Sequence, residues 1–91
     1  GPGDDVAIGV KARPGPLYGI KADRWAARAV AVTWSDLHSL EQPAESSVIL
    51  ENPNDVSTRF IAEQVGLYKF ALVVFDGLSY SAADEVEITR P

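Results

Sequence analysis

Cysteine is absent from this 91-residue chain, and histidine occurs only once, as His38. Without cysteine the chain has no disulfide to stabilise its fold and no thiolate ligand for a metal. One histidine alone does not supply the usual ligand set of a zinc site, so we interpret His38 as a solvated loop residue. The chain therefore does not belong to the small domains that are stabilised by disulfides or by a structural zinc ion.

Positive charge is also scarce, because eight Lys and Arg stand against 13 Asp and Glu and the net charge is −5. A domain that binds nucleic acid needs a basic patch for the phosphates. An anionic membrane surface would repel an acidic chain. We therefore expect neither nucleic acid nor a membrane as a partner, and we interpret the acidity as a contribution to solubility.

Long hydrophobic runs are missing as well. No stretch approaches the roughly 20 apolar residues of a membrane-spanning helix, and no segment has the pattern of a signal peptide. Gly1 and Pro2 are typical of the residues that remain when a protease removes a tag. We therefore interpret residues 1–3 as a tag remnant and residues 4–91 as a single domain of a longer protein, whose targeting segment would lie outside this sequence.

Recognisable catalytic chemistry is the last absence. The sequence contains no Gly-rich phosphate loop and no nucleophile elbow. Ser35, Asp36 and His38 are neighbours in the chain, whereas a catalytic triad is assembled from distant parts of a fold. A chain of this length buries about 60–65% of its unfolded surface in one core and leaves little room for a deep catalytic cleft. We expect no enzyme activity.

The strongest structural signal that is present is the apolar segment 66–77, which ends in the turn-forming pair Asp76-Gly77. Side chains alternate across a strand. One face therefore carries four large apolar groups: Tyr68, Phe70, Leu72 and Val74. The other face carries Lys69, Ala71, Val73 and Phe75. The first face requires a second layer to cover it, which is the arrangement of a β-sandwich.

Shorter segments of the same character occur along the rest of the chain. The expected strands cover residues 5–11, 17–22, 29–35, 47–51, 57–62 and 80–89, in addition to the long one. Residues 23–28 are interpreted as one helical turn capped by Asp23, or as a loop. Clear turn signals separate the strands, the strongest at residues 52–55. About seven short strands predict an all-β antiparallel sandwich.

Four segments resemble a known family. They are Val32-Thr33-Trp34, Ser47-Val48-Ile49-Leu50, Ser57-Thr58-Arg59-Phe60 and the strand of residues 66–77. In this order they resemble the PKD (polycystic kidney disease) domains and their Ig-like relatives. That family carries a Trp on the third strand and a later strand of the pattern Gly-x-Tyr-x-apolar-x-Leu-x-Val-x-Asp. Residues 84–89 are similar to the family's last strand, so the resemblance covers residues 29–90, and the chain is similar to a divergent member.

The resemblance implies an Ig-like antiparallel β-sandwich of about seven strands. It also implies a non-catalytic accessory module of a larger secreted, periplasmic or cell-surface protein. Such modules space neighbouring domains or contact a protein partner. The alternative is a carbohydrate-binding module that binds polysaccharide on exposed aromatic rings, with Trp25 and either Tyr18 or Tyr80 as the stacking platform.

Two aromatic residues are expected to serve the fold. Trp34 shares its strand face with Val30 and Val32, which places it between the sheets. Tyr68, just after Gly66, resembles a tyrosine corner, whose hydroxyl bonds to the backbone a few residues upstream. Together with Phe70, Leu72 and Val74, these two residues form the predicted structural core.

Four residues are candidates for binding: Trp25, Val73, Phe75 and Tyr80. Trp25 is either an exposed contact residue or a plug over one end of the sandwich. Val73 and Phe75 either form an outer apolar patch for a neighbouring domain, or are covered by a local segment of this chain.

Calcium is the one cofactor that the acidic residues suggest. Five aspartates fall at or near expected strand ends, where carboxylate oxygens can hold calcium: Asp4, Asp5, Asp55, Asp76 and Asp84. The spacing of a calcium loop, Asp-x-Asp-x-Asp-Gly, is missing, and turn formation is the simpler interpretation. We therefore expect no cofactor, with calcium as the alternative.

Overall fold

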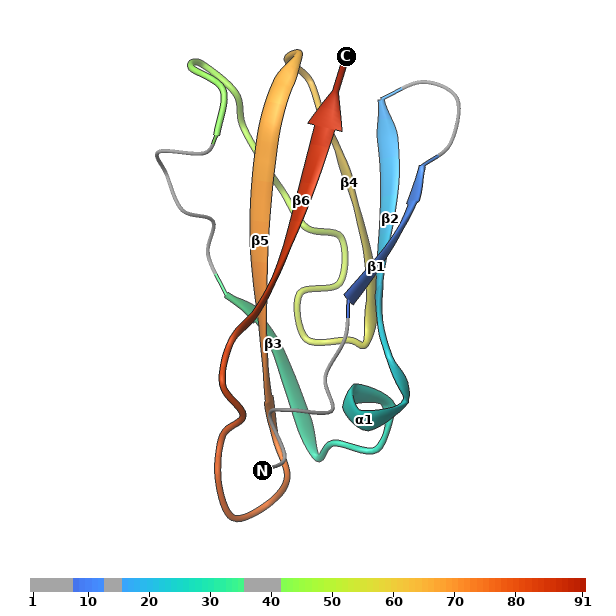
Figure 1. Ribbon diagram of the computed structural model, residues 1–91, viewed down its shortest axis with the longest axis vertical. Helices are drawn as coiled ribbons and strands as arrows, with labels where there is room; N and C mark the ends of the chain where they lie inside the picture. The colour runs from blue at the N-terminus through green and yellow to red at the C-terminus, as the bar shows by residue number, and fades with distance from the viewer. Residues whose placement is uncertain (1–7, 13–15, 36–41) are drawn as a thin grey trace.

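The computed structural model describes residues 8–12, 16–35 and 42–91, and two antiparallel sheets of three strands pack together in it (Figure 1). One sheet has the strand order β1-β2-β4, formed by β1 (Ile8–Ala12), β2 (Leu17–Ala22) and β4 (Ser57–Ile61). The other has the order β3-β5-β6, formed by β3 (Ala31–Ser35), β5 (Gly66–Phe75) and β6 (Asp84–Arg90). The predicted all-β class with two packed antiparallel sheets is confirmed.

The segment between β2 and β3 forms one helical turn, α1 (Arg24–Ala27), at the end of the sandwich where β3 begins (Figure 1). The Asp23 side chain caps this turn by accepting the N–H of Trp25 at 3.0 Å. An Asp at this position satisfies a backbone donor that lacks a partner within the helix. Of the two interpretations of residues 23–28, the structure shows the helical turn capped by Asp23.

The core lies between the two sheets and contains the inner face of β5. Tyr68, Phe70, Leu72 and Val74 are all buried, as the alternation predicted. Trp34 is 4% exposed, and its indole N–H donates to the carbonyl of Asp55 at 2.8 Å. Ile20 and Phe60 complete the core from the other sheet.

Two expected strand starts differ from the structure. Val30 is 73% exposed and precedes β3, so its predicted place on the core face with Val32 is wrong. Tyr80 makes only an isolated bridge to Phe75, and β6 begins four residues later at Asp84. Residues 5–7 of the first expected strand lie outside the described residues. The alternation of apolar and polar residues can extend past the end of a strand into a loop, so it does not show where pairing with a neighbouring strand stops.

The expected strand at residues 47–51 is wrong, because this segment belongs to neither sheet. It touches β4 through one backbone hydrogen bond, in which the N–H of Glu51 donates to the carbonyl of Arg59 at 2.9 Å. The apolar and β-branched residues of the segment favour an extended backbone, but a ladder also needs a neighbour at strand spacing along its whole length. Only the last residue of the segment meets that condition.

Tyr68 fastens the start of β5 to the loop that precedes it. Its hydroxyl accepts the N–H of Gln64 at 3.0 Å and donates to the carbonyl of the same residue at 2.7 Å. Gly66 is required between them, because its φ is +133° and a Cβ there would lie 2.9 Å from Cγ of Pro43. The predicted bond from Tyr68 to upstream backbone is present.

Tyr68→Phe is expected to lower the free energy of unfolding by about 1–2 kcal/mol, because two backbone groups of Gln64 lose their partner while ring packing is kept. Denaturant unfolding followed by tryptophan fluorescence measures the change. Tyr80→Phe is the matched control, since its ring is exposed. Equal stabilities of the two variants would contradict a structural role for the Tyr68 hydroxyl.

Candidate functional site

Trp25 lies in α1, half-buried, and packs against the hydrophobic core. The Asp23 cap holds its backbone N–H, and α1 lies at one end of the sandwich (Figure 1). Of the two interpretations of Trp25, the structure supports the plug over the exposed contact residue.

The outer face of β5 is covered in part by the chain that follows it. Ala71 is buried, while Val73 and Phe75 are half-buried. The ring of Phe75 packs on that of Tyr80, with centroids 4.8 Å apart. Ser81 donates its N–H to the carbonyl of Val74 at 2.8 Å, which holds residues 80–81 beside β5. For Phe75 the structure supports the interpretation of cover by a local segment.

Asp76 organises the turn beyond β5. One carboxylate oxygen accepts the N–H groups of Leu78 and Ser79, both at 2.8 Å, and these bonds hold the pKa of Asp76 below its usual range. The turn displays Leu78, which is almost fully exposed, and the exposed side chain of Val30 lies beside Gly77 of the same turn. Asp76 therefore has a turn-forming role.

No group of three or more His, Asp or Glu side chains in the described part of the chain could hold a metal ion. The carboxylate of Asp55 accepts the N–H of Val56 at 2.7 Å, which is again turn chemistry. Asp4, Asp5 and the lone histidine, His38, lie outside the described residues. Among the residues that the structure describes, no helix could span a membrane, since α1 has only four residues.

An open cleft of about 500 Å³ lies between residues 47–51 and β4. Its lining is mostly apolar and consists of Leu17, Ser47, Ile49, Glu51, Arg59, Phe60, Ile61 and Glu63. Ile49 is 78% exposed and Ile61 54% exposed, so two large aliphatic side chains border the cleft in contact with water. The two stretches that form it are the arms of one hairpin, joined by the turn at residues 52–56.

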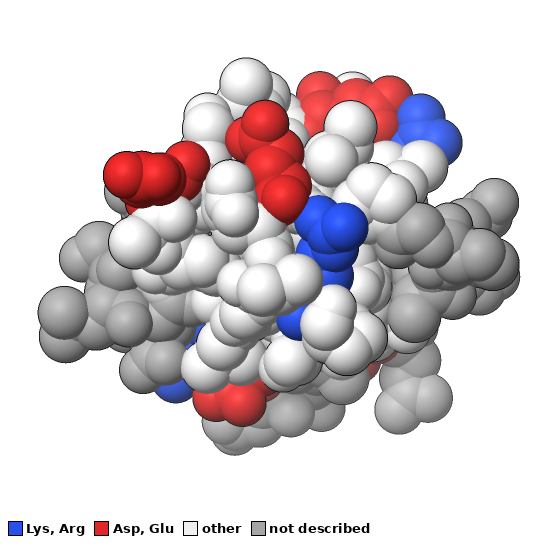
Figure 2. Space-filling model, turned by 90° about the horizontal axis from the view of Figure 1, so that it is seen from above, with Lys and Arg blue, Asp and Glu red and all other residues white. Residues whose placement is uncertain are grey.

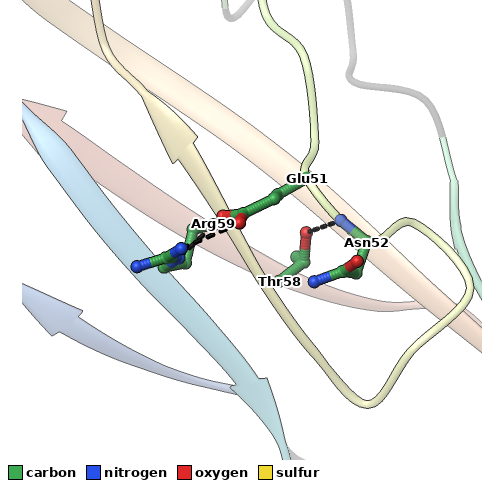
Figure 3. Close-up of polar contacts among 4 residues, drawn as sticks. All are labelled: Glu51, Asn52, Thr58 and Arg59. Atoms are coloured by element: carbon green, nitrogen blue, oxygen red, sulfur yellow. Dashed lines mark hydrogen bonds and ion pairs between the residues drawn. The ribbon is translucent and has the colours of Figure 1, made fainter.

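The hairpin is closed at its turn end by Glu51 and Arg59 (Figure 3). Besides their backbone bond, Nε and Nη2 of Arg59 donate to the two carboxylate oxygens of Glu51 at 2.7 and 2.8 Å. This two-pronged bond lowers the pKa of Glu51 and raises the pKa of Arg59. The N–H of Asn52 also donates to Oγ1 of the buried Thr58 at 3.0 Å. Beyond this end the arms separate, and the space between them is the cleft.

Sequence reasoning missed this cleft because it placed residues 47–51 in a sheet, where pairing would have filled the space. One signal could have found it. Ile49 and Ile61 lie at matching distances from the turn, each two residues beyond the Glu51–Arg59 pair. The chemistry of the lining suits an apolar side chain or a stretch of backbone.

No family model, curated protein or solved structure matches this chain.

Proposed function

We propose that this chain is a non-catalytic, Ig-like interaction module of a larger secreted, periplasmic or cell-surface protein. Three features support the Ig-like assignment. The strand orders β1-β2-β4 and β3-β5-β6 correspond to the two sheets of Ig-like sandwiches, Trp34 is buried on the third strand, and Tyr68 has the bonds of a tyrosine corner. The resemblance of residues 29–90 to PKD domains supports the same proposal.

The cleft beside β4 is the observation that carries the interaction role. Its volume of about 500 Å³ lies within the range of sites that bind ligands, which is about 300–1,000 Å³. Exposed Ile49 and Ile61 lose contact with water when a partner covers them, and this burial favours association. The Glu51–Arg59 pair keeps the closed end of the cleft in place before binding.

Carbohydrate binding is the alternative function. Two of the three aromatic rings considered for it are buried or half-buried in the structure. Tyr18 is buried and stacks on Phe60, and Trp25 is half-buried against the core. Of the three rings considered, only Tyr80 is exposed. A sugar site would therefore depend on Tyr80 and the adjacent ring of Phe75.

Selection from a phage-displayed library of random octapeptides tests the proposal. We expect selected peptides to bind the domain and to lose about tenfold or more in affinity, measured by fluorescence polarisation, when Ile49 is replaced with Ser. Val30→Ser is the matched control, because Val30 is 73% exposed and lies beside Gly77 in the turn after β5, outside the cleft lining. An empty selection, or peptides that bind Ile49→Ser as tightly as the unchanged domain, would overturn a role for the cleft. Retention on a glycan array that Tyr80→Ser abolishes would establish the alternative.

A further inference from the structure

We infer that the cleft binds an extended peptide segment with basic flanks, which enters between the two arms of the hairpin and pairs as an added strand with the free edge of β4. This inference rests on the proposed function and specifies the partner and its mode of binding. Strand addition to a sheet edge is a recurrent way to recognise peptides, with affinity from main-chain hydrogen bonds and specificity from alternate side chains.

The backbone of β4 presents the required groups. Phe60 pairs with Tyr18 on β2, and the N–H of Ala62 donates to the carbonyl of Pro16, so even-numbered residues direct their backbone groups toward β2. Consecutive residues of a strand direct these groups to opposite sides. The carbonyl of Arg59 accordingly points away from β2 and accepts the N–H of Glu51. The backbone N–H and carbonyl of Ile61 point the same way, and no described residue forms a backbone hydrogen bond with them.

The two arms separate at the position where a strand would enter. Counted from the hydrogen-bonded pair Glu51–Arg59, Ile49 comes opposite Ile61 and Ser47 opposite Glu63. All six residues line the cleft, although only the first pair is in contact through the backbone. In Figure 1 the green segment before residue 51 reaches β4 only near the yellow-green turn. The hairpin is thus joined at one end and open at the other, beside an edge of β4 where no described residue pairs with Ile61.

Charge indicates which segment fits. At the rim Arg59 is already bound by Glu51, and Arg90 donates to the carbonyls of Ala62 and Glu63. The carboxylate of Glu63 has no ion pair with a described residue. Figure 2 views the molecule from the end where β4 finishes, and acidic side chains occupy several positions there around a central group of Lys and Arg side chains. A second copy of this chain would bring a net charge of −5, whereas basic residues around an apolar anchor complement this charge and the carboxylate of Glu63.

Hydrogen exchange of the Ile61 amide, followed by NMR with a selected octapeptide, tests strand pairing. We expect exchange of this amide to slow by about tenfold or more in the complex, while the already paired amide of Phe60 changes little. N-methylation of the peptide at successive positions is expected to weaken binding at alternate residues, because alternate amides face β4. A peptide that is sensitive to Ile49→Ser but leaves Ile61 exchange unchanged would overturn strand addition and leave the proposed function standing.

A second measurement tests the basic flanks. We expect affinity to fall between about 50 and 300 mM NaCl, because exposed charges are screened over that range. Glu63→Gln is expected to reduce this salt dependence, with Glu85→Gln on β6 as the control away from the cleft. Affinity that is independent of salt and of Glu63 would overturn the charge assignment. Loss of all binding at the cleft would instead overturn the proposed function.

Discussion

Replacing Trp34 with alanine is expected to lower the free energy of unfolding by about 3–5 kcal/mol. The side chain is 4% exposed between the sheets, so its removal leaves a cavity that the neighbouring strands cannot fill completely. The substitution also removes the indole N–H that bonds to the carbonyl of Asp55, which ties the turn before β4 to β3. A domain of this length has a total stability of about 5–14 kcal/mol, so the loss is a large share of it.

Thermal unfolding followed by far-ultraviolet circular dichroism measures this effect. A loss of this size corresponds to a fall in Tm on the order of 20 °C, or to the disappearance of a cooperative transition. Trp34→Phe is the informative comparison, because it keeps an aromatic ring in the core and leaves a smaller cavity, while it also removes the bond to Asp55. An unchanged melting curve for Trp34→Ala would show that the sandwich does not depend on this residue.

Phe60→Ala is expected to cost about 3–5 kcal/mol as well, through a different part of the core. Phe60 belongs to the sheet opposite β5 and contacts three other rings. Its ring centroid lies 5.8 Å from Tyr18, 5.4 Å from Tyr68 and 4.7 Å from Phe70. Such aromatic pairs contribute about 0.5–1.5 kcal/mol beyond the area they bury. The substitution therefore weakens the contact between the sheets at its centre.

Denaturant titration distinguishes this effect from a local one. Phe60→Ala should lower the denaturant midpoint, and Phe60→Leu should recover part of the loss, because Leu refills most of the cavity without restoring the ring contacts. The exposed neighbour Ile61 offers a control, since Ile61→Ala lies one residue away on the opposite face. A midpoint for Phe60→Ala equal to that of Ile61→Ala would contradict the central place of this ring.

The core strand shows how far local patterns reach. Tyr68, Phe70, Leu72 and Val74 were predicted on one face and are buried, because alternation is a local property of an extended chain. The Asp23 cap was predictable for the same reason, since its bond spans two residues. Val30 shows the limit, because it follows the same alternation as Val32 but lies just before β3.

The candidate site was less accessible to sequence reasoning. Ile49 and Ile61 each look like ordinary strand residues, and their shared exposure beside a cleft depends on where the arm of residues 47–51 leaves β4. The same holds for Phe75, whose outward direction was predictable but whose cover by Tyr80 was one of two alternatives. In both cases the outcome depends on contacts between strands and loops, which periodicity does not encode.

By itself, then, the sequence determined the all-β class, the inward face of β5 and the buried roles of Trp34 and Tyr68. These properties follow from alternation, turn chemistry and hydrophobicity, which act within a few residues of one another. Only the tertiary structure decided that Trp25 packs against the core, that residues 47–51 belong to neither sheet, and that Ile61 borders a cleft at an edge of β4 where no described residue pairs with it. The physical reason is that strand neighbours and uncovered edges are set by packing between segments far apart in the chain.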